Sequence, residues 1–176
     1  MTLSETEAEV PLGRRSRLTA TLSRLVPLAG GIGFVLVTVV QLVLHGTAEW
    51  EERTLESALL WLVGVQGLLI GLGHLLSPDR VADSIGWPKG NPFQFEVGLA
   101  SVSYGTLGVL SVGQGQAWWL ATIVAYSIFY LGAAAGHVRE LVVRGNRSPG
   151  NAGAVLVLDV AVPLFLIVLY ALYRAG

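Results

Sequence analysis

Four side chains that can bind a metal ion or transfer a proton lie on four separate apolar segments. They are His74, Glu96, His137 and Asp159, and Asp159 is the formal charge placed deepest within its segment. Two imidazoles and two carboxylates suit iron, zinc or manganese, and helical bundles commonly build such sites from inward-facing Glu and His. The sequence therefore predicts a divalent-metal site with His74, Glu96 and His137 as ligands and Asp159 as a ligand or general base.

The same residues leave other chemistry open. Without a metal, Glu96 and Asp159 could act as acid and base, or the cluster could form a proton-transfer network. A purely structural network, in which each group satisfies a helix end or fixes packing, is a further alternative. Ionisable groups near hydrocarbon are expensive, so a functional role is the default hypothesis, most strongly for Asp159.

Helical spacing adds polar partners to the cluster. Gln66 lies eight residues before His74, so both fall on one broad helical face, and Gln94 precedes Glu96 by two. Tyr126 and Tyr130 precede His137 on one face of a single predicted helix. We expect Gln66, Gln94, Tyr126 and Tyr130 to contact a substrate or to orient the four central residues.

The composition is that of a membrane protein. Of 176 residues, 53% are hydrophobic and 13% charged, whereas about a quarter of a soluble domain is usually charged. The net charge of −1 gives no reason to expect a nucleic-acid partner, and the lack of cysteine excludes disulfides and thiolate ligands.

The fold class predicted is all-α, a polytopic transmembrane bundle with five spans. Residues 97–138 contain no Asp, Glu, Lys or Arg and are interrupted only by a Gly-Gln-Gly-Gln break, which is long enough for two crossings. We expect the spans at about 26–45, 57–76, 94–113, 117–137 and 152–173. Together they form one domain, 26–176.

Basic residues predict the orientation of the bundle. Of the 11 lysines and arginines, only Arg53 and Arg174 fall on one side of the predicted spans. The other nine fall on the opposite side, which the positive-inside tendency places in the cytoplasm. The N-terminus, with a basic tail over residues 1–25, is then cytoplasmic, and the C-terminus lies outside.

A cytoplasmic segment, 77–93, joins the second and third spans. Ser77 and Pro78 predict the start of a short helix, Gly86 predicts its end, and Trp87 suits the membrane interface. The segment is interpreted either as a lid over the cluster or as a simple connector.

Several strings in order carry a family resemblance: GHLLSPDRVADSIGW, NPFQFEVG, GAAAGHVRE, NRSPGNAG and LDVAVP. They resemble a family of small prokaryotic polytopic integral membrane proteins of unknown function. The resemblance implies a shared membrane fold in the prokaryotic cytoplasmic membrane and supplies no reaction, ligand or cofactor. His74, Glu96, His137 and Asp159 fall within its motif segments.

Two classes of function remain open from the sequence. The first is a divalent-metal-dependent enzyme in the lipid bilayer that acts on a lipid-soluble small molecule. The alternative is a small oligomeric channel, carrier or proton conduit, or a non-catalytic membrane assembly partner. Whether the protein is an enzyme, and whether it forms a homo-oligomer, is left undecided at this point.

Overall fold

The computed structural model describes residues 28–175, and the predicted basic tail 1–25 lies outside the described residues. The described chain is helical, without strands, so the predicted all-α class is confirmed for this part. Its elements are α2 (Ala29–His45), α3 (Trp50–Ala58), the π-helix η2 (Leu59–Val65), α4 (Gln66–Leu76), α5 (Pro78–Ile85), α6 (Phe93–Leu110), α7 (Gln116–Arg144), α8 (Pro149–Ala152) and α9 (Ala154–Ala175).

Three helical stretches of the described chain are long and apolar enough to cross a membrane. They are Trp50–Leu76, Gln116–Arg144 and Pro149–Ala175, and α2 is a shorter apolar helix of 17 residues. Helix α6 carries Gln94 and Glu96 in its first turn and several glycines and serines further on, which makes it less apolar.

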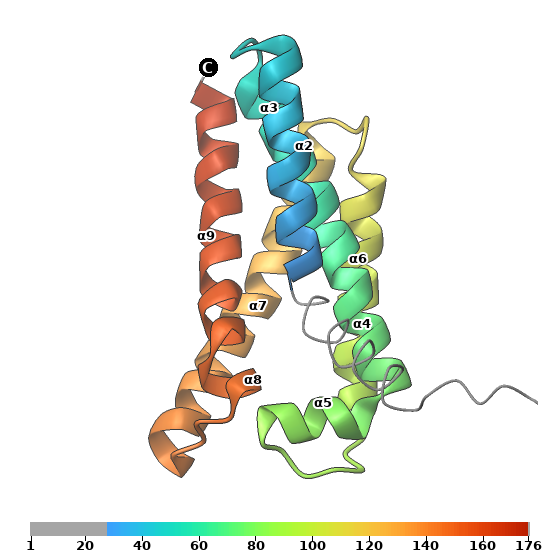
Figure 1. The fold of residues 1–176 in the computed structure, drawn as a ribbon, viewed down its shortest axis with the longest axis vertical. Coiled ribbons are helices and arrows are strands. Elements are labelled where there is room, and N and C mark those ends of the chain that lie inside the picture. The colour runs from blue at the N-terminus through green and yellow to red at the C-terminus, as the bar shows by residue number, and fades with distance from the viewer. Residues whose placement is uncertain (1–27, 176) are drawn as a thin grey trace, which may run out of the picture.

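The long helices run alongside one another, and α5 lies across one end of the bundle (Figure 1). The α6–α7 turn, the start of α3 and the C-terminus lie at the opposite end. Helix α4 packs mainly on α6, and α7 packs mainly on α9. The molecule thus has two helical pairs, which α2 and α3 help to join at the end away from α5.

The second helix begins earlier than predicted, at Trp50 and not near residue 57. Glu51 and Glu52 occupy its first turn, where acidic side chains favour the positive end of the helix dipole. Residues 50–58 contain no proline or glycine, and Leu55 and Ala58 are fully buried. Because these two side chains join the core, the helix continues upstream of its apolar stretch.

Glycines allow α6 to lie almost backbone to backbone on η2 and α4. A Cβ added at Gly105 would come within 2.6 Å of the Leu68 nitrogen, and one at Gly67 within 3.0 Å of the Gly105 Cα. A Cβ at Gly108 would collide with the backbone of Gly64. Small residues of this kind let membrane helices approach closely enough for extensive van der Waals contact. This seam therefore holds α6 in one rotational setting.

Helix α2 is fixed to the same unit by two contacts. The backbone N–H of Gly30 donates to Oε1 of Gln66 at 2.8 Å, and the Trp61 ring fills the space beside Gly33. Gln66 therefore helps to pack α2 on α4.

Replacing Gly108 by Ala should destabilise the fold, because the new methyl group must displace the η2 backbone. We expect a loss of about 1–3 kcal/mol, the usual cost of overpacking. Gly73→Ala is the matched control: it lies on α4 with open space around its Cβ position, and alanine there should leave stability unchanged or raise it. The midpoint of unfolding in mixed micelles, followed by circular dichroism, measures both. Equal midpoints for the two variants would contradict this account of the seam.

Candidate functional site

A buried histidine–carboxylate pair lies between α7 and α9. Nε2 of His137 is 3.6 Å from Oδ2 of Asp159, and both residues are less than a tenth exposed. Helical packing of α7 on α9 sets this contact. The separation is somewhat longer than a hydrogen bond, so the two groups are in close contact without being bonded.

Asn151 fixes the orientation of the His137 ring. Its Oδ1 lies 2.8 Å from Nδ1 of His137, while its Nδ2 donates to the carbonyl oxygens of His137, at 3.2 Å, and Asn146, at 2.9 Å. Because the amide nitrogen is committed to these carbonyls, the amide oxygen must accept from Nδ1–H. In the neutral ring, the lone pair of Nε2 then faces Asp159, so one proton can be shared between imidazole and carboxyl.

The segment 77–93 contacts the His137 side of this pair. As predicted, α5 begins at Pro78 and ends before Gly86, although Ser77 makes no side-chain capping bond. Ile85 accepts a hydrogen bond from Nδ2 of Asn146 at 2.9 Å, and the Trp87 ring stacks on His137 with centroids 6.4 Å apart. Space beside Gly86 is filled by Asn146 and Ser148. The packed indole separates the histidine from the surface.

Two buried tyrosines continue the polar face of α7 away from His137. The rings of Tyr126 and Tyr130 lie 4.2 Å apart, and the ring of Tyr104 on α6 lies 6.5 Å from each of them. The Tyr130 hydroxyl faces that of Ser101 on α6, without the geometry of a regular hydrogen bond. The predicted stripe of Tyr126, Tyr130 and His137 is thus buried on one face of α7.

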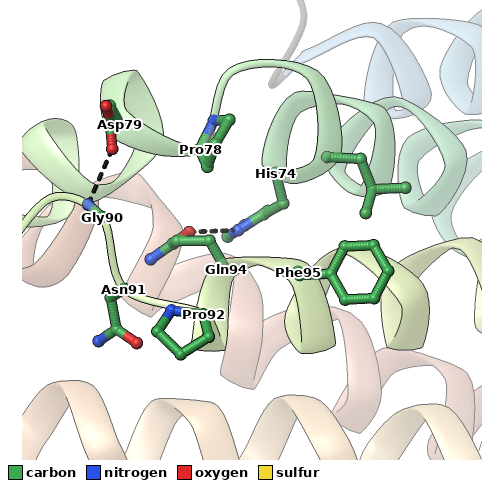
Figure 2. Close-up of a pocket in the computed structure, with 9 residues that line it drawn as sticks. His74, Pro78, Asp79, Gly90, Asn91, Pro92, Gln94 and Phe95 are labelled. Carbon is green, nitrogen blue, oxygen red and sulfur yellow. Dashed lines mark hydrogen bonds between the residues drawn. The ribbon is translucent and has the colours of Figure 1, made fainter.

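A second, separate pair joins α4 to α6. Nδ1 of His74 on α4 lies 2.7 Å from Oε1 of Gln94 at the start of α6, and the two side chains point toward each other (Figure 2). Gln94 is 1% exposed. His74 therefore has an amide as its partner, where the sequence predicted carboxylates and a second imidazole.

The predicted convergence of His74, Glu96, His137 and Asp159 is wrong for the described part of the chain. Within residues 28–175, no group of three or more His, Asp or Glu side chains is placed to hold a metal ion. Glu96 is exposed, because the buried face of α6 runs through Gln94, Gly98 and Ser101 and leaves Glu96 on the far side. The glycine seam sets that rotation, and so it separates Glu96 from both histidines.

Sequence reasoning missed the importance of Asn151 and Trp87. From the sequence alone, Trp87 is assigned only to the membrane interface, and Asn151 is given no role. The available signal was Asn151's position eight residues before Asp159, at the start of the same apolar segment. That spacing alone gives no reason to connect it with His137.

Replacing Asn151 by Ala should release the His137 ring. The variant loses three hydrogen bonds, two buried and one partly buried, so we expect the free energy of unfolding to fall by about 2–4 kcal/mol. Gln114→Ala, in the exposed α6–α7 turn, should change it by less than about 0.5 kcal/mol. Nitrogen-15 NMR of labelled histidine should show Nδ1 of His137 protonated in the wild type and a mixture of tautomers in Asn151→Ala. An unchanged tautomer would contradict the assigned role.

A family model matches this chain, whereas no curated protein and no solved structure does. The described helices and both histidine pairs fall within residues 24–176, the region that a family model matches. The chain belongs to DUF6790, a family of unknown function.

Proposed function

We propose that the chain is a multi-pass protein of the prokaryotic cytoplasmic membrane with five crossings, its N-terminus in the cytoplasm and its C-terminus outside. Three stretches have the length and composition for a crossing. Val35, Leu36 and Val43 on α2 are exposed apolar side chains, as a lipid-facing helix requires. Helices α2 and α6 would cross as shorter helices held by the longer ones, and the distribution of lysine and arginine supports the orientation.

Proton exchange is the activity that the His137–Asp159 pair supports best. The observation that carries this proposal is a buried carboxyl facing the lone-pair nitrogen of an imidazole whose other nitrogen is held by Asn151. An imidazole nitrogen and a carboxyl oxygen that face each other can pass a proton between them, which is the basis of acid–base chemistry in proteins. On the proposed topology, the pair lies toward the cytoplasmic end of the bundle.

Buried hydroxyl groups extend from the pair toward the middle of the membrane. Ser101, Ser127 and Tyr130 have buried hydroxyls without regular hydrogen-bond partners among the described residues. Such groups are common ligands of buried water. Together with Tyr126, they provide a route along the inner face of α7 for a proton that starts at Asp159.

Large apolar side chains fill most of the opposite half of the same interior, among a few buried serine and threonine hydroxyls. Leu55, Leu59 and Leu166 are fully buried there, with Ile123 beside them at 2% exposure. A permanently open channel needs a continuous polar path, so we favour a carrier that opens to one side at a time. The proposed activity is gated proton translocation, by a monomer or by a homo-oligomer.

The divalent-metal enzyme remains a prediction, with iron, zinc or manganese as the cofactor and a lipid-soluble compound as the substrate. The separation of the two histidine pairs favours proton exchange over this alternative. Elemental analysis of purified protein, prepared without chelators, distinguishes them. Stoichiometric metal in the wild type that is lost in both His74→Ala and His137→Ala would favour the enzyme.

Proton flux into liposomes tests the proposed carrier directly. Purified protein is reconstituted into liposomes that enclose a pH-sensitive dye, and a potassium diffusion potential drives proton uptake. We expect Asp159→Asn to slow uptake by roughly tenfold or more, the scale on which a lost acid–base group acts. Glu96→Gln, at an exposed carboxylate, should leave the rate unchanged. Wild-type uptake no faster than that of protein-free liposomes, or equal rates in Asp159→Asn and Glu96→Gln, would refute the carrier.

A further inference from the structure

A pocket of about 300 Å³ lies where α4 ends, α5 begins and α6 begins. Its walls include His74, Leu75, Asn91, Gln94 and Phe95 (Figure 2). Pockets that bind small molecules usually start at about this size and combine apolar walls with a few polar groups. The pocket is built from residues other than His137 and Asp159, so its occupant is a separate question from proton exchange.

Gln94, which lines this pocket, has an unused hydrogen-bond donor buried beside it. Its Oε1 is engaged by His74 at 2.7 Å, whereas its Nε2 is buried and has no hydrogen-bond partner in residues 28–175. In Figure 2 the amide nitrogen points away from His74, toward the side of the pocket formed by Gly90 and Asn91. A buried donor without a partner is uncommon in folded proteins. A ligand group that pairs with Nε2 of Gln94 must be a hydrogen-bond acceptor.

The charge of the pocket indicates a neutral acceptor. Its lining residues include Asp79 and no lysine or arginine. Oδ1 of Asp79 accepts a hydrogen bond from the Gly90 N–H at 2.9 Å, which holds the carboxylate at the rim. A phosphate or carboxylate would meet this negative charge without a compensating cation, whereas a carbonyl oxygen would not.

The rest of the wall suits a hydrocarbon chain. Leu75, Pro92 and Phe95 line the pocket, and Phe95 is 59% exposed on the outside of α6. In a bilayer, that side of the helix faces lipid. An occupant whose carbonyl reaches Gln94 can thus extend its chain past Phe95 into the membrane.

We infer that this pocket binds the neutral carbonyl group of an amphiphile, with Nε2 of Gln94 donating to the carbonyl oxygen and the chain lying against Leu75 and Phe95. The ester of a membrane lipid and a free lipid-soluble ketone or quinone share this chemistry. The inference does not depend on the proposed proton carrier, because the two sites share no residue.

Photolabelling with a long-chain alkyl ketone that carries a diazirine tests the inference on the full chain in detergent micelles. Mass spectrometry of the labelled protein should place the cross-links within residues 74–95. Gln94→Glu is the informative variant, because a carboxyl oxygen still accepts from His74 while the N–H donor is lost. We expect its half-saturating ketone concentration to rise about tenfold, as for one lost hydrogen bond of about 1.4 kcal/mol. Gln114→Leu, in the exposed α6–α7 turn, should label like the wild type.

Competition identifies the source of the carbonyl. Displacement of the label by dioctanoylphosphatidylcholine assigns the pocket to a membrane lipid, and displacement by decylbenzoquinone alone assigns it to a free carbonyl compound. Circular dichroism checks that Gln94→Glu remains folded. Failure of both competitors, unchanged saturation in a folded Gln94→Glu, or label spread evenly over the apolar face of α2 would overturn the inference.

Discussion

The cost of burying Asp159 in an apolar bundle determines the arrangement of one whole end of the molecule. A carboxyl group in such a place needs a partner, and His137 supplies it at 3.6 Å. The histidine can face the carboxyl group only if its ring orientation is fixed, and Asn151 in α8 fixes it through Nδ1. Asn151 also binds the Asn146 carbonyl, and Asn146 in turn binds Ile85 on α5. The position of α5 therefore follows from the need to satisfy one acidic side chain.

A different constraint governs the pair formed by α4 and α6. Here the contact is backbone against backbone, with Gly64, Gly67, Gly105 and Gly108 at the seam. Close packing of this kind leaves little freedom for α6 to rotate, because every glycine faces a neighbouring main chain. The seam directs Gln94 inward to His74 and leaves Glu96 exposed. Steric fit, and not charge, thus decides which polar residues of α6 meet a histidine.

The sequence predicts features that depend on a single helix. Its predictions fail where the relative rotation of two packed helices determines which side chains meet. The tyrosines and His137 share a face because their spacing matches the helical period, and the structure buries that face. Apolar segments indicated the helices, although α3 extends upstream because Leu55 enters the core. Glu96 was misplaced because its helix could have been rotated either way, and only the glycine seam selects one rotation. The pairing of Asn151 with His137 depends on how the 145–148 turn folds back, which no periodicity encodes.

Helix α5 connects the two histidine pairs although they share no residue. Its first residues, Pro78 and Asp79, line the pocket beside Gln94. Its last residue, Ile85, binds Asn146, and the next residues bring Trp87 onto His137. These eight residues form one continuous helix that side-chain contacts hold at both ends. One short helix therefore forms part of the pocket wall at its start and places the Trp87 indole against His137 just beyond its end.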